Sequence, residues 1–354
     1  MIKRRKSKEI SIGNVKIGNN NPISIQSMCN TDTRDVEKTS CQIKELADTG
    51  CELVRLAVLN KDAAGAIKDL VKCSPVPLIA DIHFDYRLAI ECINNGIAAL
   101  RINPGNIGKR EHIEKVVKLA KQQQIPIRIG VNAGSLEKEL QEKDIPLAQK
   151  MCESAMKHIK ILEDLDFDLI KISLKSSDVI TTIEAYRLMA QKTDYPLHLG
   201  VTEAGTLKNG IIKSSVGLGI LLAEGIGDTI RVSLTENPAE EVYAGWEILK
   251  SLKLRSRGVN FISCPTCGRT QIDLISLAKQ VEDRFKTLKQ PITIATMGCA
   301  VNGPGEAGSA DFGIAGGIKE GCIFKKGEII ARVPEYQLLD KFEEIICHEL
   351  KDQR

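Results

Sequence analysis

The chain has 354 residues, which is long enough for one large domain and a smaller one. Hydrophobic residues make up 43% of it and charged residues 27%, a composition that excludes a disordered protein. A net charge of +3 and only 4% aromatic residues argue against a protein that binds nucleic acid.

The first ten residues, MIKRRKSKEI, are basic, but no apolar segment follows them as it would in a signal peptide. We interpret them as a solvated run of charges. No stretch of about 18 apolar residues is present, so we expect no membrane-spanning helix. The sequence therefore predicts a soluble cytoplasmic protein that binds neither membrane nor nucleic acid.

The chain contains 11 cysteines and no signal peptide, which favours thiols or metal ligands over disulfides. Cys29 follows a predicted strand. Four cysteines of the C-terminal part, Cys264, Cys267, Cys299 and Cys322, remain without an obvious packing role. The other six lie in or beside predicted helices and are expected to be small buried hydrophobes: Cys41, Cys51, Cys73, Cys92, Cys152 and Cys347.

Short β-branched and apolar segments alternate with segments of helical periodicity. We expect helices at 36–49, 111–124, 147–165 and 238–252, among others. Eight such strands predict a (β/α)8 barrel, with an open doubly wound sheet as the alternative. The segment ISIGNVKIG (10–18) predicts a hairpin that closes the bottom of the barrel. The predicted strands are 22–28, 53–58, 77–82, 99–105, 126–132, 169–176, 196–203 and 229–235.

The pattern changes after Leu254, where one long helical segment (273–288) precedes several short strands and a final helix. We therefore predict an α/β chain. A TIM-type barrel spans residues 1–255, and a small α+β domain spans residues 256–354 and carries the unexplained cysteines.

Polar and mostly basic residues occupy the C-terminal ends of the predicted strands, where barrel enzymes place their active sites. Converging arginines that outnumber the acids indicate an anion site, and their planar guanidinium groups suit phosphate oxygens. We expect a multiply charged anion such as a diphosphate. The strand-end residues are Arg55, Asp81, His83, Arg101, Asn103, Arg128, Asn132, Lys171, Lys175, His198, Glu203, Arg231 and Ser233.

Glu203, in VTEAG, ends a strand beside a glycine-containing loop and is the main carboxylate of this basic mouth. We expect it to act in general acid–base catalysis. His83 and His198 are weaker candidates, because a hydrogen-bonded core histidine is at least as common as a catalytic one.

The motif CPTCG (264–268) is a tight chelating turn that suits either zinc or an iron–sulfur cluster. No second CxxC follows. A four-thiolate site with Cys299 and Cys322 is one completion. Three thiolates with Glu306, in MGCAVNGPGEAG (297–308), are the other, and we favour it because a carboxylate ligand leaves one iron open to substrate.

The motifs CPTCGRT, MGCAVNGPGEAG and VTEAG, after an eight-strand pattern, closely resemble the bacterial 4-hydroxy-3-methylbut-2-enyl diphosphate synthase family, also called IspG or GcpE. The resemblance covers essentially the whole chain. It implies a barrel that binds the substrate diphosphate, a C-terminal 4Fe–4S domain, and a homodimer in which the cluster domain of one subunit caps the barrel of the other.

The resemblance also implies the reaction and the roles of residues. The reaction is reductive ring opening of 2-C-methyl-D-erythritol 2,4-cyclodiphosphate, with two electrons from flavodoxin or ferredoxin. Glu203 is the acid–base residue, and a substrate oxygen replaces Glu306 on the cluster. The implied cluster ligands are Cys264, Cys267, Cys299 and Glu306, and the implied diphosphate ligands are Arg55, His83, Arg101, Asn103, Arg128, Asn132, Lys175 and Ser233.

Overall fold

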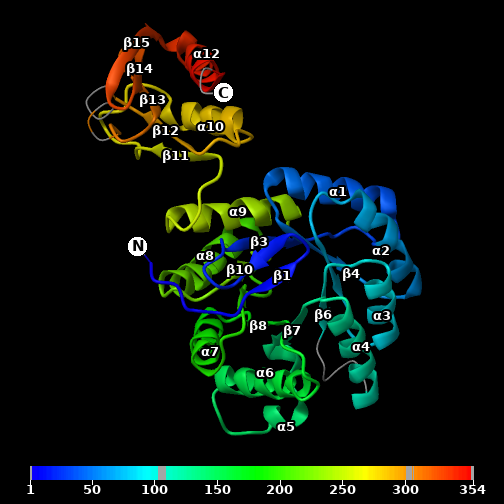
Figure 1. The fold of residues 1–354 in the computed structure, drawn as a ribbon. Coiled ribbons are helices and arrows are strands. Elements are labelled where there is room, and N and C mark those ends of the chain that lie inside the picture. Colours follow the sequence, from blue (N-terminus) through cyan, green and yellow to red (C-terminus); the bar gives the residue numbers. More distant parts are fainter. Residues whose placement is uncertain (1, 103–108, 300–304, 306, 352–354) are drawn as a thin grey trace. The chain divides into compact units, whose positions relative to one another are not determined.

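The computed structural model describes residues 2–102, 109–299, 305 and 307–351. The chain divides into two units, Met1–Arg255 and Ser256–Arg354 (Figure 1). Two predicted site residues, Asn103 and Glu306, lie outside the described residues.

The first unit is a barrel of eight parallel strands, as the sequence predicts. The order of strands is β8-β7-β6-β5-β4-β3-β10-β9, and a parallel bridge between Ile172 and Leu197 brings the two edges of this sheet together. The strands are β3 (Ser24–Met28), β4 (Leu53–Ala57), β5 (Leu78–Asp81), β6 (Ala99–Ile102), β7 (Ile127–Asn132), β8 (Ile170–Lys175), β9 (His198–Leu199) and β10 (Thr229–Ile230).

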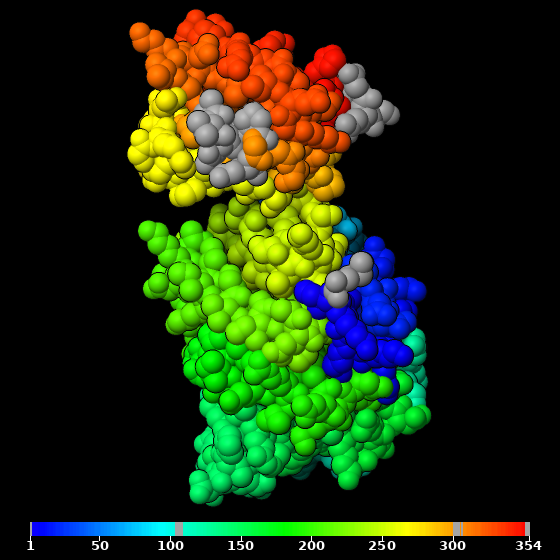
Figure 2. All heavy atoms as spheres, turned by 90° about the vertical axis from the view of Figure 1, so that its left-hand side faces the viewer, coloured from blue at the N-terminus to red at the C-terminus, as the bar shows by residue number. Residues whose placement is uncertain are grey.

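Helices alternate with these strands and cover the barrel. Several begin where an Asp or Asn side chain accepts a hydrogen bond from a backbone N–H of the first turn: Asp35, Asn60, Asp85, Asp178 and Asn237. The helices are α1 (Val36–Thr49), α2 (Lys61–Cys73), α3 (Tyr86–Asn94), α4 (Arg110–Gln122), α5 (Lys138–Gln141), α6 (Leu147–Glu163), α7 (Val179–Lys192), α8 (Leu207–Ala223) and α9 (Pro238–Ser251). Figure 2 shows the side where the green and yellow-green segments carrying α7, α8 and α9 form the surface. Within the described part of the chain, no helix is long and apolar enough to cross a membrane.

The predicted hairpin closes the N-terminal end of the barrel. Strands β1 (Ile10–Ile12) and β2 (Val15–Ile17) pair antiparallel. Their isoleucines form a buried cluster with Leu53, Ile79 and Ala99, which lie at or near the starts of β4, β5 and β6. Water is thereby excluded from this end, and polar residues inside the barrel can reach solvent only through the other end.

The basic N-terminal arm is only in part the solvated charge run that the sequence suggested, because Lys3, Lys6 and Lys8 are exposed but Arg4 and Arg5 are largely covered. The side chains of Arg4 and Arg5 are only 13% and 14% exposed. Arg4 Nη2 lies 3.1 Å from Oδ1 of the buried Asp228, and Arg5 donates to the backbone oxygens of Thr193 and Tyr195. Asp228 also accepts from the backbone N–H of Leu197 at 2.9 Å. Arg4 and Arg5 therefore connect the segments that enter β9 and β10, which explains why these two side chains are largely buried.

Two further expectations were wrong in part. Strands β9 and β10 are shorter than predicted, because the chain after Leu199 leaves the regular ladder and Glu203 adopts a left-handed φ of 52°. Cys41, Cys73 and Cys347 are exposed, since they lie on the solvent side of their helices, whereas Cys51, Cys92 and Cys152 are buried as expected.

The second unit has one five-stranded sheet in the order β11-β12-β13-β14-β15, parallel from β11 to β13 and antiparallel beyond. Strand β11 was not predicted from the sequence. Helices α10 (Leu274–Phe285) and α12 (Leu338–Lys351) pack on the face that carries Ile294, Ile314 and Ile323. The strands are β11 (Val259–Ser263), β12 (Ile292–Met297), β13 (Phe312–Gly316), β14 (Glu320–Lys325) and β15 (Glu328–Pro334).

The opposite face of this sheet is lined by smaller residues. Ala295, Met297 and Ala315 form a second cluster there with Cys322, and Cys264 packs against it. Cys322 is 2% exposed, and burial raises its pKa. These observations agree with a packing role for Cys322.

Candidate active site

The centre of the barrel contains a row of charged residues in register across four neighbouring strands. Asp81 on β5 pairs with Arg101 on β6, Arg101 pairs with Arg128 on β7, and Arg128 pairs with Lys171 on β8. Residues paired in this way lie on the same face of the sheet, here the inside of the barrel. Like charges placed directly opposite each other are destabilising, so three cations beside one anion require a further explanation.

Asp81, Arg101 and Arg128 of this row line a polar cavity of about 260 Å³ at the C-terminal ends of the strands, whereas Lys171 is not part of its lining. Seven of the eight predicted diphosphate ligands line it, and the eighth is Asn103. The cavity also contains four residues that the predicted set omitted: Asp81, Ser173, Thr202 and Arg231. The complete lining is Arg55, Asp81, His83, Arg101, Arg128, Asn132, Ser173, Lys175, Thr202, Arg231 and Ser233.

Two carboxylates neutralise only part of this charge. Asp81 lies 3.0 Å from Arg101 Nη1 and 3.5 Å from Arg55 Nε. Burial alone would raise the pKa of Asp81, but its cationic neighbours, Arg55 foremost, lower it well below its usual range. Arg231 forms a two-point ion pair with the buried Glu241 of α9, at 3.0 and 3.1 Å. Asp81 and Arg231 are among the strand-end residues that the sequence placed in the basic mouth, although the resemblance did not imply them as diphosphate ligands.

Arg55 has a second, neutral partner. Its Nε and Nη2 lie 3.1 and 2.9 Å from Sδ of Met28, and Arg231 Nη1 lies 3.6 Å from the same sulfur. A thioether is a weak acceptor and carries no charge. Met28 therefore separates the two guanidinium groups without neutralising either. Burial lowers the pKa of Arg55 to about 10.

Arg128 is the least compensated group. It is 3% exposed, and its Nε and Nη1 have no hydrogen-bond partner within the described residues. Burial and, next, the charges of Arg55 and Arg101 lower its pKa well below the ordinary value. Burial and, next, the charge of Arg128 also lower the pKa of Lys175 well below its ordinary value. A guanidinium keeps its proton even when buried, so the folded protein retains this unfavourable charge. A multiply charged anion in the cavity would relieve it.

Two glycines provide the space for these long side chains. A Cβ on Gly130 of β7 would lie 2.6 Å from Nε of Arg101. A Cβ on Gly200, just after β9, would lie 2.8 Å from both Lys175 Nζ and the backbone oxygen of Arg231. The sequence alone did not predict this role for Gly130 or Gly200. The signal that could have identified such a position is a glycine among the inward-facing residues of a strand that also carries basic residues on that face.

Glu203 lies beside this cavity, directly after the lining residue Thr202. It is exposed, and its φ of 52° is unusual for a residue other than glycine. Backbone strain of this kind is concentrated at functional sites, where it fixes the direction of a side chain. The position suits a carboxylate that exchanges protons with a bound ligand.

The three cysteines predicted as cluster ligands, Cys264, Cys267 and Cys299, lie on two loops that follow neighbouring parallel strands. Cys264 follows β11 and Cys299 lies just beyond β12. The backbone N–H of Gly298 donates to Sγ of Cys264 at 3.1 Å, and the N–H of Gln271 donates to the oxygen of Gly298 at 3.1 Å. Hydrogen bonding from the backbone of Arg269 lowers the pKa of Cys267, which favours the thiolate.

Within the described residues, no three His, Cys, Asp or Glu side chains lie close enough together to hold a metal ion. Glu306, the predicted fourth ligand, lies outside that part of the chain. The donor set nevertheless fits a thiolate-bound metal group, because two cysteine loops are hydrogen-bonded to each other and one thiol is shifted toward its ligating form.

A parallel eight-stranded barrel with a cationic, partly uncompensated mouth defines a TIM-barrel enzyme that acts on a phosphorylated small molecule. Comparison with known proteins agrees. Residues 7–246 match the GcpE TIM-barrel domain, and residues 260–348 match the GcpE protein C-terminal domain. The chain belongs to the GcpE family.

Curated relatives are similar over nearly their whole length. The chain is 60% identical to the 4-hydroxy-3-methylbut-2-en-1-yl diphosphate synthase (flavodoxin) of Clostridium perfringens, with 98% of this chain and 99% of that protein covered. It is 58% identical to the Geobacter sulfurreducens protein of the same name, with 95% and 96% covered.

Solved structures are similar in fold alone. A 3-dehydroquinate dehydratase from Geobacillus kaustophilus superposes with a TM-score of 0.51 at 12% identity, covering 70% of this chain and 99% of that one. The Bacillus subtilis spore coat polysaccharide biosynthesis protein spsE superposes with a TM-score of 0.52 at 11% identity, covering 70% and 73%.

Gly130→Ala tests whether glycine is needed beside Arg101. The new methyl group must displace the guanidinium, so we expect affinity for inorganic pyrophosphate to fall about tenfold, as for loss of one hydrogen bond to a charged group. Isothermal titration calorimetry measures this affinity. Gly65→Ala is the matched control, because its added methyl group has no neighbour closer than 4.0 Å. Equal affinities for the two variants would contradict the role of Gly130.

Proposed function

We propose that this protein catalyses the reductive ring opening of 2-C-methyl-D-erythritol 2,4-cyclodiphosphate to 4-hydroxy-3-methylbut-2-enyl diphosphate. The observation that carries the proposal is the cavity in the barrel mouth, where five basic residues converge and, among the described residues, only Asp81 and Glu241 form ion pairs with them. The five are Arg55, Arg101, Arg128, Lys175 and Arg231. Membership of the GcpE family and the names of its close relatives supply the chemistry.

In this proposal the cavity residues bind and orient the diphosphate. Arg128 and Lys175, which form no ion pair with a carboxylate among the described residues, take phosphate oxygens. Asn132 at the end of β7 and Ser233 after β10 donate hydrogen bonds. Fixing both phosphates holds the carbon ring in one orientation beside Glu203. Arg55 and Arg231 stay available because Met28, a neutral residue, lies between them.

The overall change consumes two electrons and one proton. A ring C–O bond breaks, a carbon–carbon double bond forms, and a hydroxyl group takes a proton and leaves as water. We assign that proton to the carboxyl group of Glu203, which is exposed and can be reprotonated from solvent.

We further propose that a 4Fe–4S cluster, held by Cys264, Cys267, Cys299 and Glu306, supplies the electrons one at a time when bound. Flavodoxin or ferredoxin is the proposed donor, and the names of the relatives favour flavodoxin. All 11 cysteines are free, which supports a reducing compartment such as the cytoplasm.

A homodimer completes the proposal. The apolar stripe of Ile212, Val216 and Ile220 on α8 supports it, since these residues are 62%, 47% and 36% exposed at helical spacing. Leu59 and Phe84, in the loops after β4 and β5, are 79% and 74% exposed beside the charged cavity. Large apolar side chains at such a rim are expected to be covered by another surface.

Glu203→Gln tests the proposed proton transfer. We expect turnover of the cyclodiphosphate to fall by about 10²–10⁴-fold, the usual contribution of a general acid, with the visible absorption of the cluster unchanged. An anaerobic assay with a low-potential reductant measures this. Wild-type protein that fails to convert the cyclodiphosphate, although it carries the cluster, would contradict the proposed function itself.

Cys267→Ser tests the cluster ligands. Anaerobically purified wild-type protein is expected to be brown, and this variant should lose most of its iron and sulfide because an alcohol is a poor iron ligand. Cys322→Ala is the matched control, since Cys322 packs in the apolar cluster and should keep the colour. Loss of iron in both variants would support the alternative set of four thiolates, which includes Cys322, and iron retained in Cys267→Ser would contradict both sets.

A further inference from the structure

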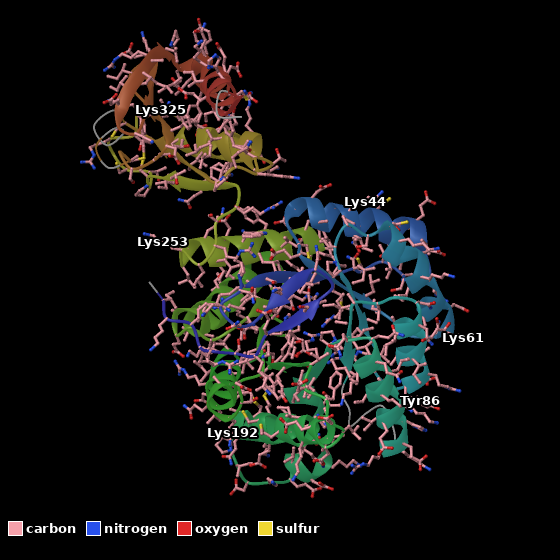
Figure 3. All side chains as sticks on the ribbon, in the orientation of Figure 1. Lys44, Lys61, Tyr86, Lys192, Lys253 and Lys325 are labelled. Atoms are coloured by element: carbon pink, nitrogen blue, oxygen red, sulfur yellow. The ribbon has the colours of Figure 1, made fainter. Side chains whose placement is uncertain are left out.

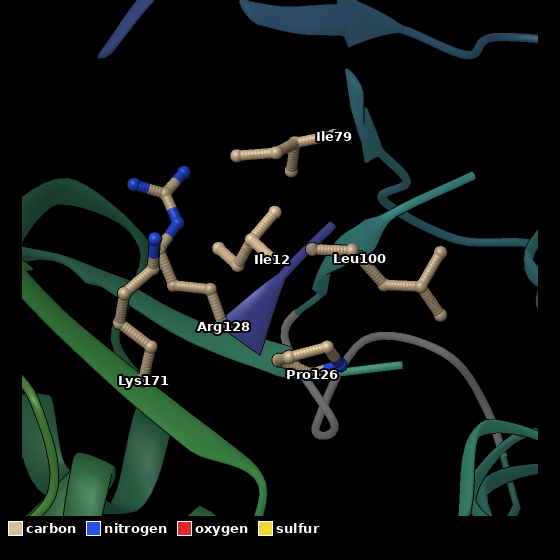
Figure 4. Close-up of a pocket in the computed structure, with 7 residues that line it drawn as sticks. Ile12, Ile79, Leu100, Pro126, Arg128 and Lys171 are labelled. Carbon is tan, nitrogen blue, oxygen red and sulfur yellow. The ribbon is translucent and has the colours of Figure 1, made fainter. Parts of the chain in front are cut away.

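Lys171 is a buried amine that the proposed reaction does not use. It lies on β8, is 1% exposed, and its Nζ has no hydrogen-bond partner within the described residues. Figure 4 shows it inside the barrel with Arg128, in an enclosed space that Ile12 and Ile79 border from the side of the hairpin. An unpaired ammonium group in such a place is costly, whereas a neutral amine is tolerated.

The position of Lys171 relative to the cavity follows from the period of the strand. Lys171, Ser173 and Lys175 point to the same face of β8, and the last two line the cavity. Lys171 is the next inward residue along the strand. It therefore lies one layer beneath the cavity floor, close enough to respond to a bound polyanion through the low-dielectric interior.

The groups that face Lys171 are mostly cationic. They are Arg128 on β7, Arg55 on β4, Lys175 on its own strand and His198 on β9. The one acid among its electrostatic neighbours is Asp228, which already holds Arg4, Ser7 Oγ and the N–H of Leu197. Burial first, and then Arg128, lowers the pKa of Lys171 well below its ordinary value.

His198 could take up a proton in the same layer, but its environment is different. Its Nδ1 is hydrogen-bonded to Thr229 Oγ1 at 2.7 Å, and burial together with Arg128, Lys175 and Lys171 lowers its pKa well below the ordinary value. The ordinary pKa of an imidazole is much lower than that of an amine. A bound anion that raises both pKa values therefore favours protonation of Lys171 while His198 stays neutral.

We propose that binding of a diphosphate in the cavity is coupled to the uptake of one proton by Lys171. The inference rests on the proposed function, because it requires a diphosphate in that cavity. The anion brings negative charge close to a layer of unbalanced cations, and this favours the ammonium form of Lys171. The amine gains the proton from solvent, and no covalent bond between heavy atoms changes.

This coupling has a use in the free enzyme. A neutral Lys171 lessens repulsion within the row of Arg101, Arg128 and Lys171 while the cavity holds no anion. After binding, the additional positive charge strengthens the hold on the diphosphate. Since the bound state carries more protons than the free state, the contribution of Lys171 to affinity decreases as the pH rises.

The experiment is calorimetric titration of inorganic pyrophosphate into wild-type protein and Lys171→Met, in two buffers of different ionisation enthalpy at one pH near 7. Comparing buffers gives the number of protons taken up, and comparing proteins cancels the ionisation of pyrophosphate itself. We expect Lys171→Met to take up about one proton fewer and to bind about tenfold more weakly. Lys171→Gln provides a second neutral variant if methionine impairs folding.

Lys192→Met is the matched control, because Lys192 is exposed at the end of α7 on the outside of the barrel (Figure 3). It should take up as many protons as the wild type. Equal proton uptake by Lys171→Met and the wild type would overturn the inference while leaving the proposed function intact. Absence of pyrophosphate binding by the wild type would instead contradict the proposed function, and the inference with it.

Discussion

The burial of cations without matching anions is the constraint on which the rest of this structure depends. Asp81 pairs with Arg101 and Arg55, and Glu241 pairs with Arg231, but no carboxylate among the described residues forms an ion pair with Arg128 or Lys175. A protein selected for stability alone would place Val, Ile or Leu at these inward positions of the barrel. In the proposed function the substrate provides the missing anion, and its two phosphate groups balance the cations of the interior.

Other parts of the barrel make this arrangement possible. The hairpin closes the bottom with isoleucines, so the charges face a single open end. Gly130 and Gly200 leave room for Arg101 and Lys175. The N-terminal arm provides Arg4 and Arg5 as partners for Asp228, so this buried acid is balanced without the cations of the cavity. Each of these features affects the same cluster of charges.

The sequence predicted the barrel well, because period-2 and period-3.6 patterns are local and the helix α1 (Val36–Thr49) could be located to the residue. It also predicted that strand-end residues meet, since parallel strands of one barrel end on one face. It could not predict which acid pairs with which arginine. Asp81 pairs with Arg55 and Arg101, and Glu241 pairs with Arg231, because of distances that only the folded chain sets. Arg4 and Asp228, which also pair, are 224 positions apart in the sequence. Gly130 and Gly200 were missed because their role depends on the path of another side chain.

Measurement of unfolding by urea for wild-type protein and Arg128→Met, with and without inorganic pyrophosphate, tests the central claim most directly. Without pyrophosphate, the account predicts that the free energy of unfolding of Arg128→Met equals that of the wild type or exceeds it by about 1–4 kcal/mol, since an uncompensated buried charge is removed. With pyrophosphate, the wild type should be stabilised and the variant much less so. A variant that is less stable than the wild type without the anion, and stabilised equally by it, would contradict the account.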